Sequence, residues 1–105
     1  MKKSDYTLKS EFAKTCAEAY YCQYIDDDPV DGTPTVIFDR ETEKFSWQSS
    51  ETPLLSSEVK ITTVEQGDYG CIDDDWDSKE VREVLVNIIM SDSITLGMVI
   101  RAISF

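Results

Sequence analysis

Apolar residues recur every three or four positions in the first part of the chain. Between residues 4 and 24 this spacing forms one stripe, which begins at Leu8 and ends at Tyr24. A stripe with this period is typical of a helix that buries one face. Ser4 or Thr7 would cap the helix, because each offers a side-chain oxygen to the backbone amides of the first turn.

A second and stronger stripe predicts a helix over residues 78–90. Its apolar positions begin at Val81 and continue at helical spacing to the end of the stretch. Asp77 or Ser78 would serve as the N-cap, and Glu80 follows Asp77 at the spacing of a capping box. We therefore expect an amphipathic helix that starts at a well-defined residue.

Between these helices the pattern changes to the alternation of β-strands. The β-prone runs 35–39 and 44–48 are joined by a short polar connector, which predicts a hairpin with a loop rather than a tight turn. A third strand is expected over 58–65. Regular alternation assigns Ile61 to one face of this strand and Thr62 to the other.

Residues 94–105 fit two patterns. Gly97 lies inside the segment, and apolar side chains alternate along it, which favours a strand over a helix. The alternating residues are Ile94, Leu96, Met98, Ile100 and Ala102. Ser93 would cap a helix, however, and Val99 and Ile103 fit a helical stripe. We expect a buried C-terminal strand, with a helix as the alternative.

Together these elements predict an α+β fold in a single acidic domain that spans residues 1–105. The expected order is an N-terminal helix, an antiparallel sheet made of the hairpin and the third strand, an amphipathic helix, and a C-terminal strand on the sheet.

The charge balance restricts the partners of such a domain. The chain has 21 acidic and 10 basic residues, and its net charge is −11. A field of this sign repels nucleic acid and anionic membranes, which are polyanions, and attracts basic proteins. The alternative is that the acidity serves solubility alone.

Other features of the composition indicate a cytoplasmic protein without a common catalytic centre. The chain has no histidine, which removes the usual triads, imidazole zinc sites and the common general base. Its three cysteines are an odd number at wide spacing, and the start Met1-Lys2-Lys3 is not followed by an apolar stretch. This pattern predicts reduced thiols and no secretory signal. We expect no enzymatic activity and no cofactor.

Two runs of aspartate are the most unusual features of the sequence, the first over residues 26–31 and the second over residues 73–77. Neither run fits a calcium loop. An EF-hand requires glutamate at its twelfth position. With Asp27 placed first the twelfth residue is Phe38, and with Asp73 placed first it is Val84.

An interface explains the aspartate runs better. In the second run Trp76 lies among four carboxylates, and buried aromatic residues surrounded by charge are typical of binding hot spots. Asp75 and Asp77 also suit the start of the following helix. The predicted partner-binding residues are Asp26, Asp27, Asp28, Asp31, Asp73, Asp74, Asp75 and Trp76.

A metal-dependent enzyme is the remote alternative. Glu58 and Lys60 have the E-x-K spacing in which a carboxylate binds magnesium and a lysine stabilises charge. Asp31 or Asp39 would supply a further carboxylate. A nuclease of this charge would repel its substrate, which argues against it.

The expectation that follows is a small inhibitor that binds the basic active-site surface of a nuclease. An immunity protein that neutralises a nuclease toxin is the most concrete form. A phage-type antagonist of a host defence nuclease, acting by nucleic-acid mimicry, has the same features. The rival from another class is a regulatory or adaptor domain with no inhibitory role.

Overall fold

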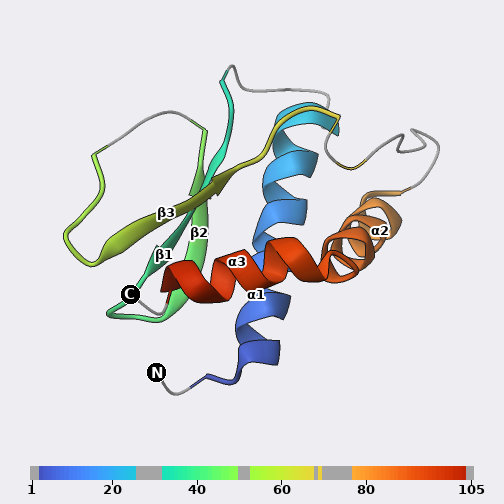
Figure 1. Cartoon of the computed structure of the whole chain (residues 1–105). Helices are drawn as coiled ribbons and strands as arrows, with labels where there is room; N and C mark the ends of the chain where they lie inside the picture. Colours follow the sequence, from blue (N-terminus) through green and yellow to red (C-terminus); the bar gives the residue numbers. More distant parts are fainter. Residues whose placement is uncertain (1–2, 26–31, 50–52, 68, 70–76, 104–105) are drawn as a thin grey trace.

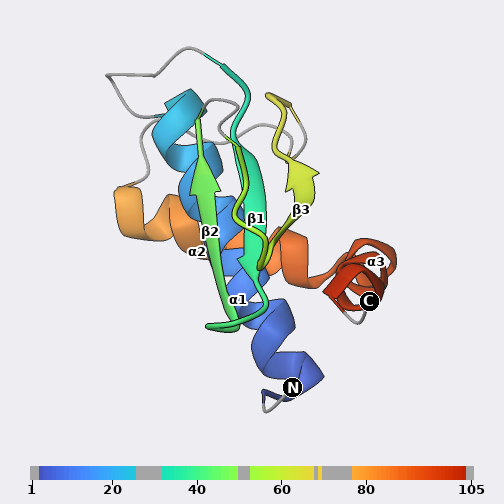
Figure 2. The ribbon, with the colours of Figure 1, turned by 90° about the vertical axis from the view of Figure 1, so that its left-hand side faces the viewer.

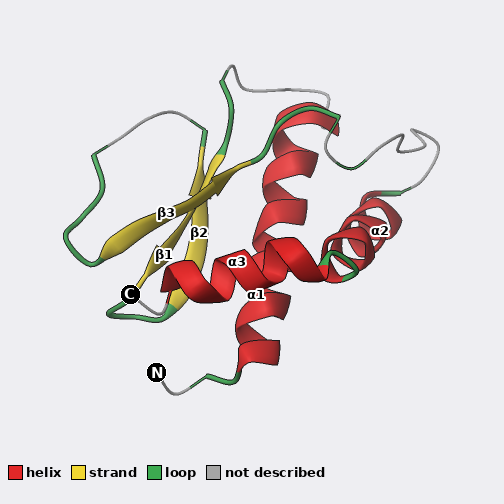
Figure 3. Cartoon of the chain, in the orientation of Figure 1, coloured by secondary structure: helices red, strands yellow, loops and turns green. Residues whose placement is uncertain are grey.

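The computed structural model of the chain describes residues 3–25, 32–49, 53–67, 69 and 77–103. Its elements form an α+β fold, as predicted (Figure 1). In chain order they are the helix α1 (Asp5–Tyr20), the π-helical turn η1 (Tyr21–Ile25), the strands β1 (Thr35–Asp39), β2 (Lys44–Gln48) and β3 (Glu58–Thr63), and the helices α2 (Ser78–Met90) and α3 (Ser93–Ile103). The strands gather on one side of the molecule, with α1 and α2 on the other (Figure 3).

The three strands form one antiparallel sheet in the order β2-β1-β3. The predicted hairpin is confirmed, with Phe38 opposite Phe45 and Asp39 opposite Lys44. The Asp39 carboxylate closes the connecting turn by accepting the backbone N–H of Glu41 at 2.8 Å. Local hydrogen bonding by an aspartate is a common way to hold such a turn.

The third strand is present, but its predicted alternation is wrong beyond Lys60. A β-bulge lies between the two halves of the β1–β3 pairing, so that Ile37 pairs with Lys60 while Val36 pairs with Thr62. Ile61 therefore has no Cα partner on β1, and it packs against the core instead. One extra residue of this kind interrupts the two-residue period.

Helix α1 covers the inner face of the sheet and forms the centre of the core, and Figure 2 shows it behind the strands. Its buried stripe includes Leu8, Phe12 and Cys16, as predicted. Phe12 contacts Phe45 of β2 edge to face, with ring centroids 5.8 Å apart. Ser4 is the N-cap, and its hydroxyl accepts the backbone N–H of Thr7.

Helix α2 confirms the most regular part of the sequence pattern. Val81, Leu85 and Ile89 are buried, and the helix packs against α1. Asp77 is the N-cap: its carboxylate accepts the backbone N–H of Glu80 at 2.8 Å.

The expected C-terminal strand is wrong, because residues 93–103 form helix α3. Asp92 caps this helix by accepting the backbone N–H of Thr95 at 3.1 Å. The helix buries Leu96, Val99 and Ile103, and it leaves Ile94 and Met98 exposed. The alternating apolar residues are thus shared between two faces of a helix, and Gly97 is tolerated inside it.

Helices α2 and α3 meet at a sharp corner. The angle between them is 79°, and only two residues separate their ends. Among the described residues, neither helix alone is long and apolar enough to cross a membrane, and the two reach that threshold only as this bent pair.

Candidate functional site

All eight predicted partner-binding residues lie outside the described residues, in the segments 26–31 and 70–76. Their role remains a prediction. The structure does describe the residues on either side of each segment, and these show where the two runs are attached to the fold.

The first run is attached at the C-terminal end of α1. It follows Ile25, the last residue of η1, and it precedes Gly32. The side-chain amide of Gln23 in η1 donates a hydrogen bond to the Gly32 carbonyl at 2.6 Å. Gly32 has φ of +118°, and a Cβ atom there would lie 2.5 Å from the Ser49 carbonyl oxygen. Only glycine suits both conditions.

The second run is attached at the same end of α1. Tyr69, four residues before Asp73, packs its ring edge to face on Tyr20, with centroids 5.0 Å apart. The Tyr20 hydroxyl also accepts the backbone N–H of Gly67 at 3.4 Å. The segments leading into the two runs therefore share one anchoring surface.

We call this anchoring surface the tyrosine junction, and it consists of Tyr20, Gln23, Tyr24 and Tyr69. Tyr24 contacts Tyr20 with ring centroids 5.2 Å apart, and its hydroxyl donates to the Val64 carbonyl at 2.9 Å. The role of these clustered tyrosines in attaching the runs was not predicted from the sequence. π-helical turns are often found at functional sites. Here the turn η1 carries Gln23, which hydrogen-bonds to Gly32, and Tyr24, which hydrogen-bonds to Val64.

An ion pair fastens α2 beside the tyrosine junction. Arg82 donates two hydrogen bonds to the Glu18 carboxylate, at 2.5 and 3.1 Å, and its guanidinium lies 4.3 Å from the centre of the Tyr21 ring. The Arg82 hydrogen bond lowers the pKa of Glu18, and Glu18 in turn raises the pKa of Arg82. This contact joins α1 to α2, the helix that follows the second run in the sequence.

The charge of the chain is distributed unevenly. The described residues include twelve acidic and nine basic side chains, so this part of the protein is close to neutral. Nine acidic residues and one lysine lie outside it, and seven of those nine are in the two aspartate runs. Most of the net charge of −11 therefore belongs to segments that start or end at the tyrosine junction.

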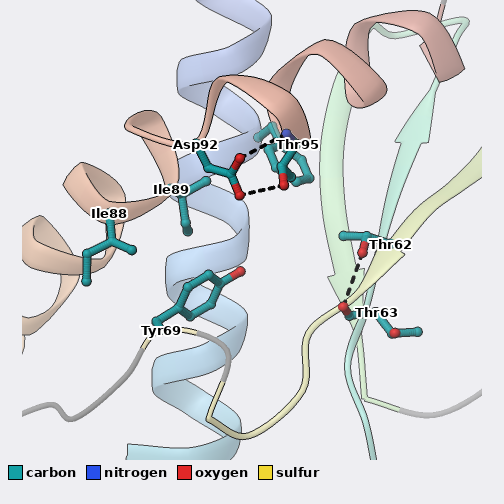
Figure 4. Close-up of a pocket in the computed structure, with 8 residues that line it drawn as sticks. Thr62, Thr63, Tyr69, Ile88, Ile89, Asp92 and Thr95 are labelled. Atoms are coloured by element: carbon teal, nitrogen blue, oxygen red, sulfur yellow. Dashed lines mark hydrogen bonds between the residues drawn. The ribbon is translucent and has the colours of Figure 1, made fainter.

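A cavity of about 330 Å³ lies between α1, β3 and the corner that joins α2 to α3 (Figure 4). The described residues that line it are Phe12, Thr62, Thr63, Tyr69, Ile88, Ile89, Asp92 and Thr95. Phe12 is fully buried and forms its apolar floor, whereas Ile88 and Asp92 are exposed at its edge. Tyr69 belongs both to this cavity and to the tyrosine junction.

Polar atoms face the cavity from three elements. Asp92 and Thr95 lie at the start of α3, Thr62 and Thr63 lie on β3, and the Tyr69 hydroxyl extends toward the space between them (Figure 4). The Asp92 carboxylate accepts the Thr95 hydroxyl at 2.7 Å as well as its backbone N–H. These two hydrogen bonds lower the pKa of Asp92, so the carboxylate is ionised at neutral pH.

This cavity was not predicted from the sequence. The cap predicted for a C-terminal helix was Ser93, although Asp92 and Thr95 have the spacing of an N-cap and its third helical residue. That spacing is the sequence signal from which the start of α3 could have been predicted. The contribution of Thr62 depends on the bulge in β3, which no local pattern reveals.

The residues of the enzyme alternative are close together, but their carboxylates serve the turns. Asp39 pairs with Glu58 across the sheet, and Lys60 follows on the same strand. The backbone N–H of Glu41, with that of Thr42 and the Ser57 hydroxyl, lowers the pKa of Asp39. Glu58 accepts the backbone N–H of Leu55 at 2.8 Å.

A metal centre finds no support in this geometry. Within the part of the chain that the structure describes, no three acidic or cysteine side chains are placed to hold a metal ion. Asp31, the other carboxylate considered, lies outside that part.

No known family model, curated protein or solved structure matches this chain.

Proposed function

We propose that this protein is a small acidic cytoplasmic inhibitor that binds and occludes the basic active-site surface of a nuclease. The most concrete form is an immunity protein that neutralises a nuclease toxin. The predicted contacts are made by the aspartate runs around residues 26–31 and 73–75, together with Trp76. The protein itself carries out no reaction.

The observation that carries the proposal is the position of the charge. Two aspartate runs, 42 residues apart between Asp31 and Asp73, are attached through described residues to one tyrosine junction. The rest of the protein is nearly neutral, and most of the negative charge lies in two segments that are attached at the same place. This arrangement would present the carboxylates of both segments to one partner. A charge that served solubility alone has no reason to be concentrated in this way.

The mechanism is occlusion by charge pairing. Carboxylates pair with the lysine and arginine side chains that would otherwise hold phosphate groups of the nucleic acid. The long-range negative field also accelerates the encounter with a basic partner.

A second function, the regulatory or adaptor domain, is favoured by one specific observation. Ile94 and Met98 of α3 are 77% and 61% exposed, and they lie one helical turn apart on its outer face. An apolar helix face of this kind is a common docking surface for another protein. Binding through this face would depend little on salt.

The deciding experiment is to capture the partner from the native host and to measure its association rate at two salt concentrations. An occluding inhibitor should associate roughly tenfold or more slowly at about 150 mM than at about 15 mM salt. A rate that does not depend on salt would support the adaptor function instead. A captured partner without a basic surface would overturn the inhibitor proposal.

Matched charge variants make the experiment specific to the aspartate runs. One variant changes Asp73, Asp74 and Asp75 to asparagine. The control changes the exposed residues Asp5, Glu41 and Glu83 to their amides, which removes the same charge from the scaffold. Only the first variant should lose most of the salt dependence, because charges at the interface steer the encounter with the partner more strongly than charges far from it.

A further inference from the structure

The cavity beside the tyrosine junction has the chemistry of a binding site for one particular side chain. We propose that it receives an arginine side chain from the basic partner, with Asp92 accepting from the guanidinium. This inference rests on the proposed inhibitor function and names a contact that the partner makes at this site.

The polar groups of the cavity call for a ligand that donates hydrogen bonds. The polar residues that line the cavity are Thr62, Thr63, Tyr69, Thr95 and the carboxylate Asp92, and no lysine or arginine is among the described lining residues. The Thr62 hydroxyl already donates to the Thr63 carbonyl and the Thr95 hydroxyl to Asp92, so both hydroxyl oxygens are left as acceptors. A guanidinium group offers five N–H donors in a rigid plane, and it pairs with carboxylates through two parallel bonds. A carboxylate has about four acceptor positions, and those of Asp92 are only partly occupied by Thr95 and by the backbone N–H of Ile94.

The apolar part of the cavity matches the rest of an arginine. Phe12 is fully buried and Ile89 is 3% exposed, so this part of the wall is apolar. Ile88 and Asp92 lie at the exposed edge, through which a side chain can enter. The methylene stem of arginine packs on apolar surface while its charged end reaches polar groups. At about 330 Å³ the cavity is near the lower limit for ligand pockets, which suits one side chain.

The electrostatic balance at the site favours a cation. The start of α3 contributes a partial positive charge of about +0.5, which opposes a cation. The full negative charge of Asp92 lies directly at that helix end and outweighs it.

Arginine suits the site better than lysine for a geometric reason. The acceptors come from α3, β3 and Tyr69, so they surround the ligand from several directions (Figure 4). The planar guanidinium group has five N–H donors that can reach several of these acceptors at once, whereas the ammonium group of lysine is a compact point charge with three donors.

The first test measures a chain-like arginine probe on the full-length protein. Nα-acetyl-arginine amide is titrated while amide and methyl resonances are followed by NMR. We expect the largest shifts at Thr62, Ile89 and Thr95. The citrulline analogue, which has the same shape without the charge, should bind at least about tenfold more weakly. Equal binding of the two probes, or shifts confined to residues far from the cavity, would overturn the proposal.

Two matched variants test the role of Asp92. Asp92→Asn keeps an N-cap acceptor for α3, because asparagine caps helices as well as aspartate does. Asp77→Asn makes the same change at the start of α2, outside the cavity. Arginine affinity should fall about tenfold in Asp92→Asn and remain unchanged in Asp77→Asn. An equal loss in both variants would mean that net charge, rather than the cavity, attracts the probe.

The same variants separate this inference from the proposed function. If the captured partner binds with the expected salt dependence but equally well to Asp92→Asn, the inhibitor function stands and the arginine contact is wrong. If the probe binds in the cavity but no basic partner is captured, the source of the guanidinium is a free small molecule. That outcome would overturn both the partner arginine and the inhibitor function.

Discussion

Asp77 and Asp92 each begin a helix, and each does so with a carboxylate that accepts a backbone N–H three residues ahead. The two caps differ in their surroundings. Asp77 is the last residue of the second aspartate run, whereas Asp92 lines the cavity. At the scale of single residues, the aspartates of this acidic protein therefore have different roles. The effect of an aspartate on helix capping must be measured separately from its effect on partner binding.

Alanine substitutions separate these duties. Asp77→Ala removes the N-cap of α2 and should lower the free energy of unfolding by about 1 kcal/mol, as measured by urea denaturation. Asp73→Ala and Asp74→Ala should weaken partner binding and leave the stability nearly unchanged. A larger stability loss in the second pair than in Asp77→Ala would mean that the run supports the fold rather than the partner. Asp77→Asn, which retains a cap, provides the control.

At the scale of elements, helices α1 and α2 and the hairpin follow from local patterns, but α3 does not. Its residues Ile94, Leu96 and Met98 alternate like those of a strand. The structure buries Leu96 and leaves Ile94 and Met98 exposed. Which apolar residues are buried is decided by the cap at Asp92 and by packing against α1, and a short apolar run contains neither kind of information.

In the candidate site, too, the features that depend on local sequence were predicted and those that depend on contacts between distant elements were not. The capping role of Asp77 was predicted correctly, because a cap depends on residues three positions apart. The tyrosine junction and the cavity were not predicted, because they join side chains from α1, β3 and the α2–α3 corner. Contacts between distant elements leave no period in the sequence.

Two glycines provide a matched test of the α3 assignment. Gly97 lies inside α3, and no atom lies within 4 Å of a Cβ built there. Gly97→Ala should therefore stabilise the protein by about 0.5–1 kcal/mol, because alanine has the higher helix propensity. Gly32→Ala should destabilise it, since φ there is +118° and the added Cβ would collide with Ser49. Urea denaturation of both variants measures the difference, and a destabilising Gly97→Ala would contradict a helix at this position.

The ion pair between α1 and α2 makes stability depend on pH. Arg82 lowers the pKa of Glu18 below its ordinary value of 4.5, so the pair stabilises the fold above that value. Its contribution is lost as the pH falls through the lowered pKa. Because both side chains are more than a third exposed, the gain should be below about 1 kcal/mol.

Glu18→Gln tests this contribution directly. In the wild-type protein the free energy of unfolding should fall as the pH drops below about 4.5, and the fall should be shallower in Glu18→Gln. Urea denaturation at neutral and acidic pH gives both slopes. Glu83→Gln removes one charge from the exposed face of α2 and should keep the wild-type slope. A wild-type slope in Glu18→Gln would show that the ion pair does not couple α1 to α2.

At the scale of the whole molecule, a nearly neutral scaffold carries two strongly acidic segments. Like charges that are brought together on folding repel one another, and the repulsion is weakened by salt. The tyrosine junction fixes described residues next to both segments at one end of α1, and we expect this to bring the charges of the segments closer together in the folded chain than in the unfolded chain. The stability of the fold should therefore depend on ionic strength, even without a partner.

Thermal unfolding measures this repulsion. The Tm should rise between about 10 mM and about 200 mM NaCl at neutral pH, because the screening length falls from roughly 30 to below 10 Å. Changing Asp26, Asp27 and Asp28 to asparagine should raise the Tm at low salt and reduce the gain from added salt. The control is Asp5, Glu41 and Glu83 changed to their amides, which removes three charges that lie apart in the sequence on α1, the hairpin turn and α2. If the control reduces the salt gain as much as the aspartate variant does, the repulsion comes from the net charge alone, and co-anchoring of the two runs contributes nothing to it.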